Sequence, residues 1–163
     1  MIKSYLIVVV TYACALAGAI YFLKLQGSIN DVLVKTLMAD VIATVIVFCF
    51  SVIFKNASLY DPYWSVAPPI ILIYWNLKVA ATGNATIELY AAVIIFWSIR
   101  LTYNWFKGWQ GIKHEDWRYQ LLRANNPSIY PIVNLTGIHL FPTLMVFAGM
   151  LPVYYSFRGN ISE

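Results

Sequence analysis

Charged residues are scarce in this sequence of 163 residues, at 11% of the total, against about 25% in an average soluble domain. Hydrophobic residues make up 61%, and one soluble core of this length could not bury so much apolar surface. A lipid environment, in contrast, accepts apolar side chains on the outside of a protein. The composition therefore excludes an ordinary soluble domain and predicts a membrane protein.

Cysteine and histidine are also rare, with two residues of each type. Cys14 and Cys49 both lie inside apolar runs, so we expect small buried side chains rather than a disulfide. No group of Cys and His residues has the spacing of metal ligands, so no metal site is predicted. The positive charges are scattered between apolar segments, as topology signals are, and we therefore expect no nucleic-acid partner.

Five apolar segments predict membrane-spanning helices of a single domain, because lipid leaves backbone polar groups to be satisfied within their own segment. They cover residues 5–23, 32–54, 66–81, 87–105 and 132–157. Pro68 and Pro69 are expected in the first turn of the third helix, where proline is tolerated. Pro142 and Pro152 are expected to kink the fifth helix. The predicted fold is an all-α, polytopic bundle of about five transmembrane spans.

Positive charges also predict the orientation of the chain. The side that holds the N-terminus and the loops after the second and fourth spans has more Lys and Arg residues than the other side. This bias predicts a multi-pass protein whose N-terminus and second and fourth loops are cytoplasmic, with the C-terminus outside. Two spans separate the second loop from the fourth, so these loops are expected to share a face in either orientation.

Polar residues inside the predicted spans are candidates for function. Arg100 could extend its charge to the interface, or it could bind an anionic group such as a cofactor phosphate. Asn104 lies one turn later on the same helix face. Asp40 is expected to pair with Lys35 or Arg100, or to mark a polar pocket. His139 is expected to form a hydrogen bond between helices.

Two stretches on the shared face combine aromatic and charged residues, which suits a flat ligand, although an interfacial aromatic belt is the alternative for the aromatic residues. Asp61 precedes the third span and is either a helix cap or a functional acid. The run His114-Glu115-Asp116 resembles an acid–base cluster, but a solvated helix start explains it equally well.

Four blocks follow one another along the chain: residues 60–68 (YDPYWSVAP), 100–105 (RLTYNW), 115–119 (EDWRY) and 137–143 (GIHLFPT). In order and spacing they resemble the DUF1295-type branch of the steroid 5α-reductase-like membrane proteins. The resemblance implies a reductase that takes hydride from NADPH and delivers it to an activated carbon–carbon double bond. Its expected substrate is a hydrophobic small molecule, lipid-like or steroid-like, reached from the lipid bilayer.

The resemblance also implies residue roles by position. Asp61 and Tyr63 would be catalytic, with Asp61 as the partner of a Tyr63 hydroxyl that stabilises the developing enolate oxygen. Tyr60 and Trp64 would contact the substrate. The cofactor side would consist of Arg100, Asn104, Glu115, Asp116, Arg118 and Arg123.

One family motif is missing from the sequence. The family's C-terminal half has a Gly-Leu-Trp run followed by a Ser-Arg-His-Pro-Asn-Tyr block, which supplies much of the NADPH site, and this chain has neither. We therefore expect a truncated chain, a separate C-terminal half, or lost chemistry, and in each case no reductase activity from the chain alone. The alternatives are a non-enzymatic scaffold or lipid-binding helix bundle and, less favoured by the first block, a methyltransferase.

Overall fold

The protein is described by a computed structural model that covers residues 1–27, 29–79 and 85–159. These residues form helices joined by turns and contain no strand, which confirms the all-α prediction. The end of the third predicted span (80–81), most of the loop after it (82–84) and the last four residues lie outside the described residues.

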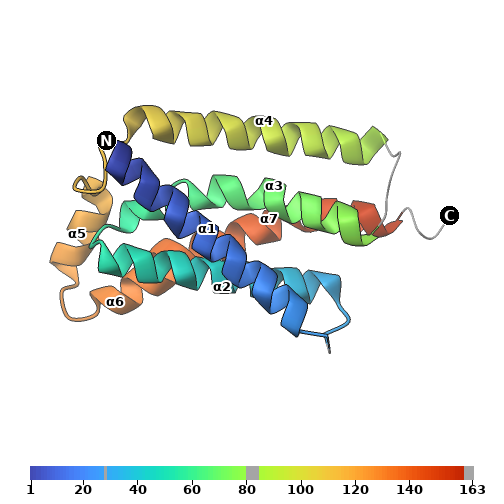
Figure 1. Cartoon of the computed structure of the whole chain (residues 1–163), viewed down its shortest axis with the longest axis horizontal. Coiled ribbons are helices and arrows are strands. Elements are labelled where there is room, and N and C mark those ends of the chain that lie inside the picture. The colour runs from blue at the N-terminus through green and yellow to red at the C-terminus, as the bar shows by residue number, and fades with distance from the viewer. Residues whose placement is uncertain (28, 80–84, 160–163) are drawn as a thin grey trace.

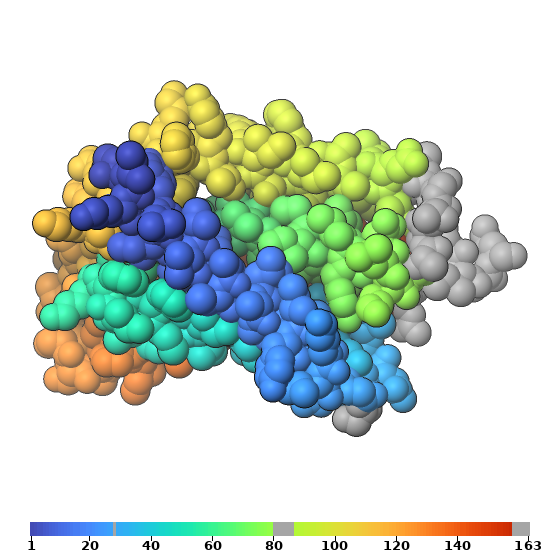
Figure 2. All heavy atoms as spheres, in the orientation of Figure 1, coloured from blue at the N-terminus to red at the C-terminus, as the bar shows by residue number. Residues whose placement is uncertain are grey.

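Four long helices and one composite C-terminal helix make the bundle (Figure 1). The long helices are α1 (Ile2–Leu25), α2 (Val32–Ile53), α3 (Tyr63–Val79) and α4 (Ala85–Gly108). The composite helix consists of α6 (Tyr130–Val133), η2 (Asn134–Leu140) and α7 (Phe141–Gly159). Two short elements, η1 (Ala57–Leu59) and α5 (Trp117–Asn125), lie in the second and fourth loops. In the space-filling view α1 crosses the face over α2, and α4 forms a separate ridge (Figure 2).

Three of these helices are long and apolar enough to cross a membrane by length and composition, namely residues 2–25, 32–53 and 130–157. They correspond closely to the first, second and fifth predicted spans. For α3 and α4 the transmembrane assignment stays a prediction. Helix α3 has 17 residues, which span about 26 Å at 1.5 Å per residue, slightly less than a typical hydrocarbon core.

Helix α3 begins at Tyr63, three residues before the predicted start, so that Pro68 and Pro69 lie inside the helix rather than in its first turn. Pro69 has no N–H group, and the carbonyl of Ser65 therefore lacks its usual partner one turn later. The hydroxyl of Ser98 on α4 donates to that carbonyl. The Ser65 hydroxyl in turn hydrogen-bonds Thr102, with 2.9 Å between the oxygens. The prolines thus create a polar attachment point between α3 and α4.

The composite C-terminal helix changes its hydrogen-bond register before Pro142. Residues 134–140 form a π-helix, and the Phe141 N–H donates to the carbonyl of Thr136, five residues earlier. Wide turns of this kind occur as short insertions in α-helices, often at functional sites. The disturbance predicted for Pro142 therefore takes the form of a π-helical segment directly before it.

Buried residues lie between helices, while many large apolar side chains face outward, as expected for a protein surrounded by lipid. Trp75 of α3 is fully buried, and its indole N–H donates to Thr36 of α2. Cys14 and Cys49 are free, as predicted, but both are exposed. The prediction that they are buried was wrong, because an apolar sequence environment does not distinguish the core from the lipid-facing surface.

Candidate functional site

The second and fourth loops meet at one end of the bundle, which confirms that they share a face. Asn56 donates its side-chain N–H groups to the carbonyls of Ile112 and His114, with N–O distances of 2.7 and 3.1 Å. The Asp116 N–H donates to the Ser58 hydroxyl at 2.9 Å. Side chains of the second loop thus satisfy backbone groups of the fourth loop, and these contacts hold the two loops together.

Glu115 is the centre of this attachment and is buried. One of its carboxylate oxygens accepts from the Ala57 N–H at 2.8 Å and from Arg123 at 3.0 Å. The Arg123 guanidinium also lies over the ring of Tyr130, 4.8 Å from its centroid. Glu115 therefore joins η1 to α5, and Arg123 extends the attachment to the start of the C-terminal helix.

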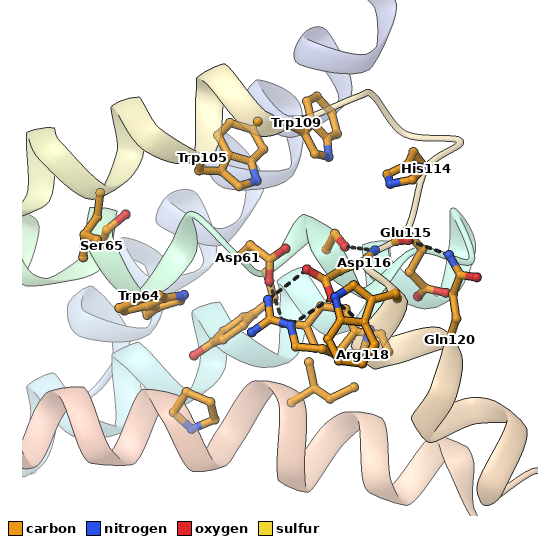
Figure 3. A pocket seen from close by; sticks show the side chains of 18 of the residues that line it. Asp61, Trp64, Ser65, Trp105, Trp109, His114, Glu115, Asp116, Arg118 and Gln120 are labelled. Atoms are coloured by element: carbon orange, nitrogen blue, oxygen red, sulfur yellow. Dashed lines mark hydrogen bonds and ion pairs between the residues drawn. The ribbon is translucent and has the colours of Figure 1, made fainter.

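An open cleft of about 850 Å³ lies beside these loops (Figure 3). The start of α3, the end of α4, the fourth loop, α5 and the C-terminal helix contribute to its walls. The predicted site residues in its lining are Tyr60, Asp61, Trp64, Glu115, Asp116 and Arg118. Leu101 and Trp105 of the second block and Ile138, Phe141 and Pro142 of the fourth also line it, so the cleft brings together residues of all four sequence blocks.

Asp61 forms a short polar contact at the cleft. The Tyr119 hydroxyl donates to its carboxylate, with 2.5 Å between the oxygens. Burial raises the pKa of Asp61 to about 6, although the hydrogen bond from Tyr119 acts in the opposite direction. Burial likewise raises the pKa of Tyr119, and the Asp61 carboxylate raises it further. Asp61 is therefore an acid that can exchange a proton near neutral pH.

Asp116 and Arg118 neutralise each other at the cleft entrance. The Arg118 guanidinium donates twice to the Asp116 carboxylate, at 2.8 and 2.9 Å, and this lowers the pKa of Asp116. Asp116 also accepts from the Arg118 N–H and caps α5. The helix-start interpretation of the His114-Glu115-Asp116 run is confirmed for Asp116.

Two indole rings form one wall of the cleft. Trp105 and Trp109 stack with their ring centroids 4.9 Å apart. Their indole N–H groups are buried and have no acceptor within the described part of the chain. In Figure 3 both nitrogens lie on the side of the rings that faces Asp61 and Asp116. Because a buried donor without an acceptor is unfavourable, this wall suits a flat ligand that offers a hydrogen-bond acceptor.

Arg100 and Asn104 share a face of α4, as their spacing predicts, but both are exposed and neither lines the cleft. The helix turns Leu101, Trp105 and Gly108 toward the cleft instead. Arg100 and Asp61 are therefore not brought together at the cleft. The cofactor roles of Arg100 and Asn104 stay predictions.

Tyr63 faces away from the cleft and lines a second, largely apolar groove of about 240 Å³ between α1, α2 and α3. Its hydroxyl donates to the carboxylate of Asp40 at 2.7 Å, and both residues are buried. The predicted pairing of Tyr63 with Asp61 is therefore wrong, as is the expectation that Asp40 pairs with Lys35 or Arg100. The sequence signal for Asp40 was an acidic residue inside an apolar run, but its partner Tyr63 is 23 residues away and on another helix.

His139 is fully buried and does not form the predicted hydrogen bond between helices. Its Nδ1 lies 2.9 Å from the carbonyl of Asn134 in the same helix, and its Nε2 has no partner among the described residues. Thr143, one turn later, makes the contact between helices, with Thr44 of α2 at 2.8 Å. The polar position expected in this helix is therefore shifted by one turn.

A comparison with family models matches residues 47–162, which is more than two thirds of the chain, to the family described as "Protein of unknown function (DUF1295)". The matched region contains all four sequence blocks, the cleft-lining loops and Tyr63. The chain matches no curated protein and no solved structure.

Proposed function

The chain belongs to the DUF1295 family, a steroid 5α-reductase-like family domain, and we propose that it forms the substrate-binding part of a membrane-embedded reductase of activated carbon–carbon double bonds. The observation that carries this proposal is the pair of Tyr63 and Asp40, buried at an apolar groove between α1, α2 and α3. One hydroxyl in contact with one carboxyl group is sufficient to bind and polarise the carbonyl group of an otherwise apolar molecule.

The groove suits a flat or elongated apolar substrate. Small side chains, Ala15, Ala19, Ala39 and Ala43, line it and leave the space between the helices. Aliphatic residues of α1 and α3 form much of the remaining walls, together with the aromatic rings of Tyr12 and Tyr74. Since α1 and α2 are long and apolar enough to cross a membrane, a molecule dissolved in the bilayer could enter without passing through water.

The proposed reaction defines the role of the Tyr63–Asp40 pair. Adding hydride to the β-carbon of an unsaturated carbonyl compound places negative charge on the carbonyl oxygen, and a fixed donor at that oxygen stabilises the transition state. When Asp40 is protonated, it can donate to the Tyr63 oxygen and leave the phenol proton free for the carbonyl. Tyr63 is then the donor and Asp40 the residue that orients it.

NADPH is the expected hydride source, and the cleft fits it only in part. The stacked indoles, whose N–H groups are unpaired among the described residues, suit a flat ring that has an acceptor, such as the end of the cofactor that does not react, because hydride transfer needs the nicotinamide in contact with the substrate at the groove. Arg118, however, is the one guanidinium among the described residues of the cleft, and Asp116 already holds it. The phosphates of a dinucleotide therefore find no cradle in the described residues, and we propose that a further segment or a separate C-terminal half supplies one.

The proposal can be tested by binding alone, so that the test does not depend on turnover. The full chain is reconstituted in lipid nanodiscs with an apolar unsaturated ketone, a 3-oxo-4-ene steroid, and the carbonyl stretching frequency of the bound probe is recorded by infrared spectroscopy. We expect a lower frequency than in hydrocarbon, because Tyr63 donates to the oxygen. The variant Tyr63→Phe should lose this shift and bind about threefold to tenfold more weakly, as for one lost hydrogen bond.

Tyr74→Phe is the matched control, since Tyr74 lines the same groove without a hydrogen bond to Asp40. It should leave the carbonyl frequency unchanged. A probe that binds with an unshifted carbonyl, or one that shifts equally in both variants, would refute the polarising pair. The lipid-binding bundle would then be the better description of this chain.

A further inference from the structure

A continuous set of polar side chains crosses the bundle between the groove and the cleft. From the Asp40–Tyr63 pair it continues to Thr44, which lies one helix turn after Asp40 on α2, so that the two side chains share a helix face near Tyr63. The Thr44 hydroxyl lies 2.8 Å from that of Thr143 on α7. Thr143 lies 2.6 Å from the hydroxyl of Tyr60, the residue that follows η1. All five side chains are buried.

The two ends of this set reach different cavities. Asp40 and Tyr63 line the groove, whereas Tyr60 lines the cleft at the loop end of the bundle. The rings of Tyr60 and Tyr63 stack with centroids 5.4 Å apart, which holds the ends of the set in place. Its members come from α2, α3, α7 and the residue that follows η1, so only the tertiary structure brings them together.

We propose that Tyr60, Thr143 and Thr44 carry protons from the cleft to the Asp40–Tyr63 pair. The use of this path rests on the proposed function: reduction of an unsaturated carbonyl consumes one proton for each hydride, and a groove that opens to lipid cannot supply it. The relay residues act on the substrate only through Tyr63 and Asp40, so they are positioning and proton-transfer residues.

The proton transfer leaves no net charge on Tyr63, Thr44, Thr143 or Tyr60. Asp40 takes a proton from Tyr63, which takes one from Thr44, which takes one from Thr143, which takes one from Tyr60. A solvent proton from the cleft restores Tyr60, so one solvent proton is consumed for one O–H bond formed at Asp40. Each hydroxyl can donate and accept at once, and oxygen separations of 2.6–2.8 Å are ordinary O–H···O distances.

Thr143 is the residue on which the path depends. Its hydroxyl donates to the carbonyl of His139 at 3.0 Å and accepts from both sides of the set. For transfer, the Thr143 hydrogen turns from that carbonyl toward Thr44, and the Thr44 hydrogen turns from Thr143 toward Tyr63. A valine at this position would keep the shape of the side chain and remove the hydroxyl that links Thr44 to Tyr60.

The test measures proton exchange at Asp40 in the full chain, reconstituted in nanodiscs without substrate. The carbonyl band of the Asp40 acid is assigned by its loss in Asp40→Asn and followed by infrared spectroscopy after a change from H₂O to D₂O. Thr143→Val and Tyr60→Phe should each slow the deuterium shift of this band at least about tenfold, the rate equivalent of one lost hydrogen bond. Thr143→Ser should restore the rate.

Thr11→Val is the control, because Thr11 is equally buried but donates only to the carbonyl of Ile7 in its own helix. It should exchange at the rate of the unmodified chain, and helix content and thermal midpoint are measured for every variant. Equal rates in Thr143→Val and the unmodified chain would show that protons reach Asp40 from the groove, which overturns the relay. The same conclusion follows if Thr143→Ser is as slow as Thr143→Val, or if no Asp40 acid band occurs at any pH at which the chain is folded.

The outcome separates the relay from the reductase proposal, because no substrate is present in the exchange experiment. Exchange that depends on Thr143 together with an unshifted probe carbonyl would refute the reductase proposal alone. A probe carbonyl shifted by Tyr63 together with exchange that ignores Thr143 would refute the relay alone.

Discussion

Glu115→Ala is expected to detach the second loop from the fourth and to destabilise the whole loop end of the bundle. In the structure one carboxylate oxygen of Glu115 accepts from the Ala57 N–H and from Arg123, at 2.8 and 3.0 Å. The Ala57 residue is 1% exposed, so water cannot replace the lost acceptor without opening the loop. The substitution therefore leaves a buried donor unpaired.

The size of the effect follows from these two contacts. An unpaired buried N–H group costs about 1–3 kcal/mol. The Arg123 side chain is 41% exposed, so its ion pair with Glu115 is screened by water and adds at most about 1 kcal/mol. We expect the free energy of unfolding to fall by about 2–3 kcal/mol, which corresponds to a thermal midpoint lower by about 5–10 °C for a chain of this size.

Thermal unfolding of the detergent-solubilised chain, followed by circular dichroism, measures this effect. Hydrogen exchange at the Ala57 amide shows whether the loss is local to this contact. Glu115→Gln keeps an oxygen for the Ala57 N–H and should lose only about 1 kcal/mol. Glu88→Ala removes an exposed acid from the first turn of α4 and should cost less than about 1 kcal/mol. If Glu115→Ala is no worse than Glu88→Ala, the attachment of the two loops through Glu115 is refuted.

Three further substitutions test other parts of the structure. Because burial raises the pKa of Asp61 to about 6, ionisation of Asp61 opposes folding, and the free energy of unfolding should fall by up to about 3 kcal/mol as the pH rises from 4 to 6. Asp61→Asn should flatten that dependence in thermal unfolding scans. Identical pH profiles for the two proteins would contradict the raised pKa. Ser98→Ala should leave the Ser65 carbonyl unpaired and cost about 1–2 kcal/mol in denaturant unfolding, and an unchanged midpoint would show that this contact does not stabilise the bundle. Gly111 has a φ of +97°, and a Cβ there would lie 3.2 Å from the Ser4 hydroxyl. Gly111→Ala should therefore lower the free energy of unfolding by about 1–2 kcal/mol in the same assay. A neutral effect would show that this position is not strained by a side chain.

The helices of this protein were largely predictable from the sequence, for a physical reason. A segment in lipid satisfies its backbone within itself, so apolar runs and their interruptions set the helix positions. The predicted segment 32–54 differs from α2 by one residue at its end. The largest error concerned α3, where Pro68 and Pro69 were expected in the first turn. The buried Ser65 carbonyl, which Pro69 leaves without its helical partner, is satisfied by Ser98, a contact that depends on another helix.

The face of the site was predictable too, because it follows from counting spans. Two predicted spans separate the second and fourth loops, and the loops pack together through Asn56, Ser58 and Glu115. The sequence blocks also identified Asp61, Trp64 and Arg118, which line one cleft. The position of these residues along the chain was sufficient to predict that they share a face, because each block lies within a single loop or helix end.

The pairing of side chains was decided by the tertiary structure alone. Asp61 and Tyr63 are neighbours in sequence, but α3 begins between them and directs one to the cleft and the other to the groove. Their partners, Tyr119 and Asp40, are 58 and 23 residues away. The rotation of a helix about its axis, which turns Arg100 outward and Trp105 inward, depends on packing against neighbours. Composition and periodicity therefore determine that this chain is a helical membrane protein with a polar loop face, while the rotation and packing of its helices determine which acid meets which hydroxyl.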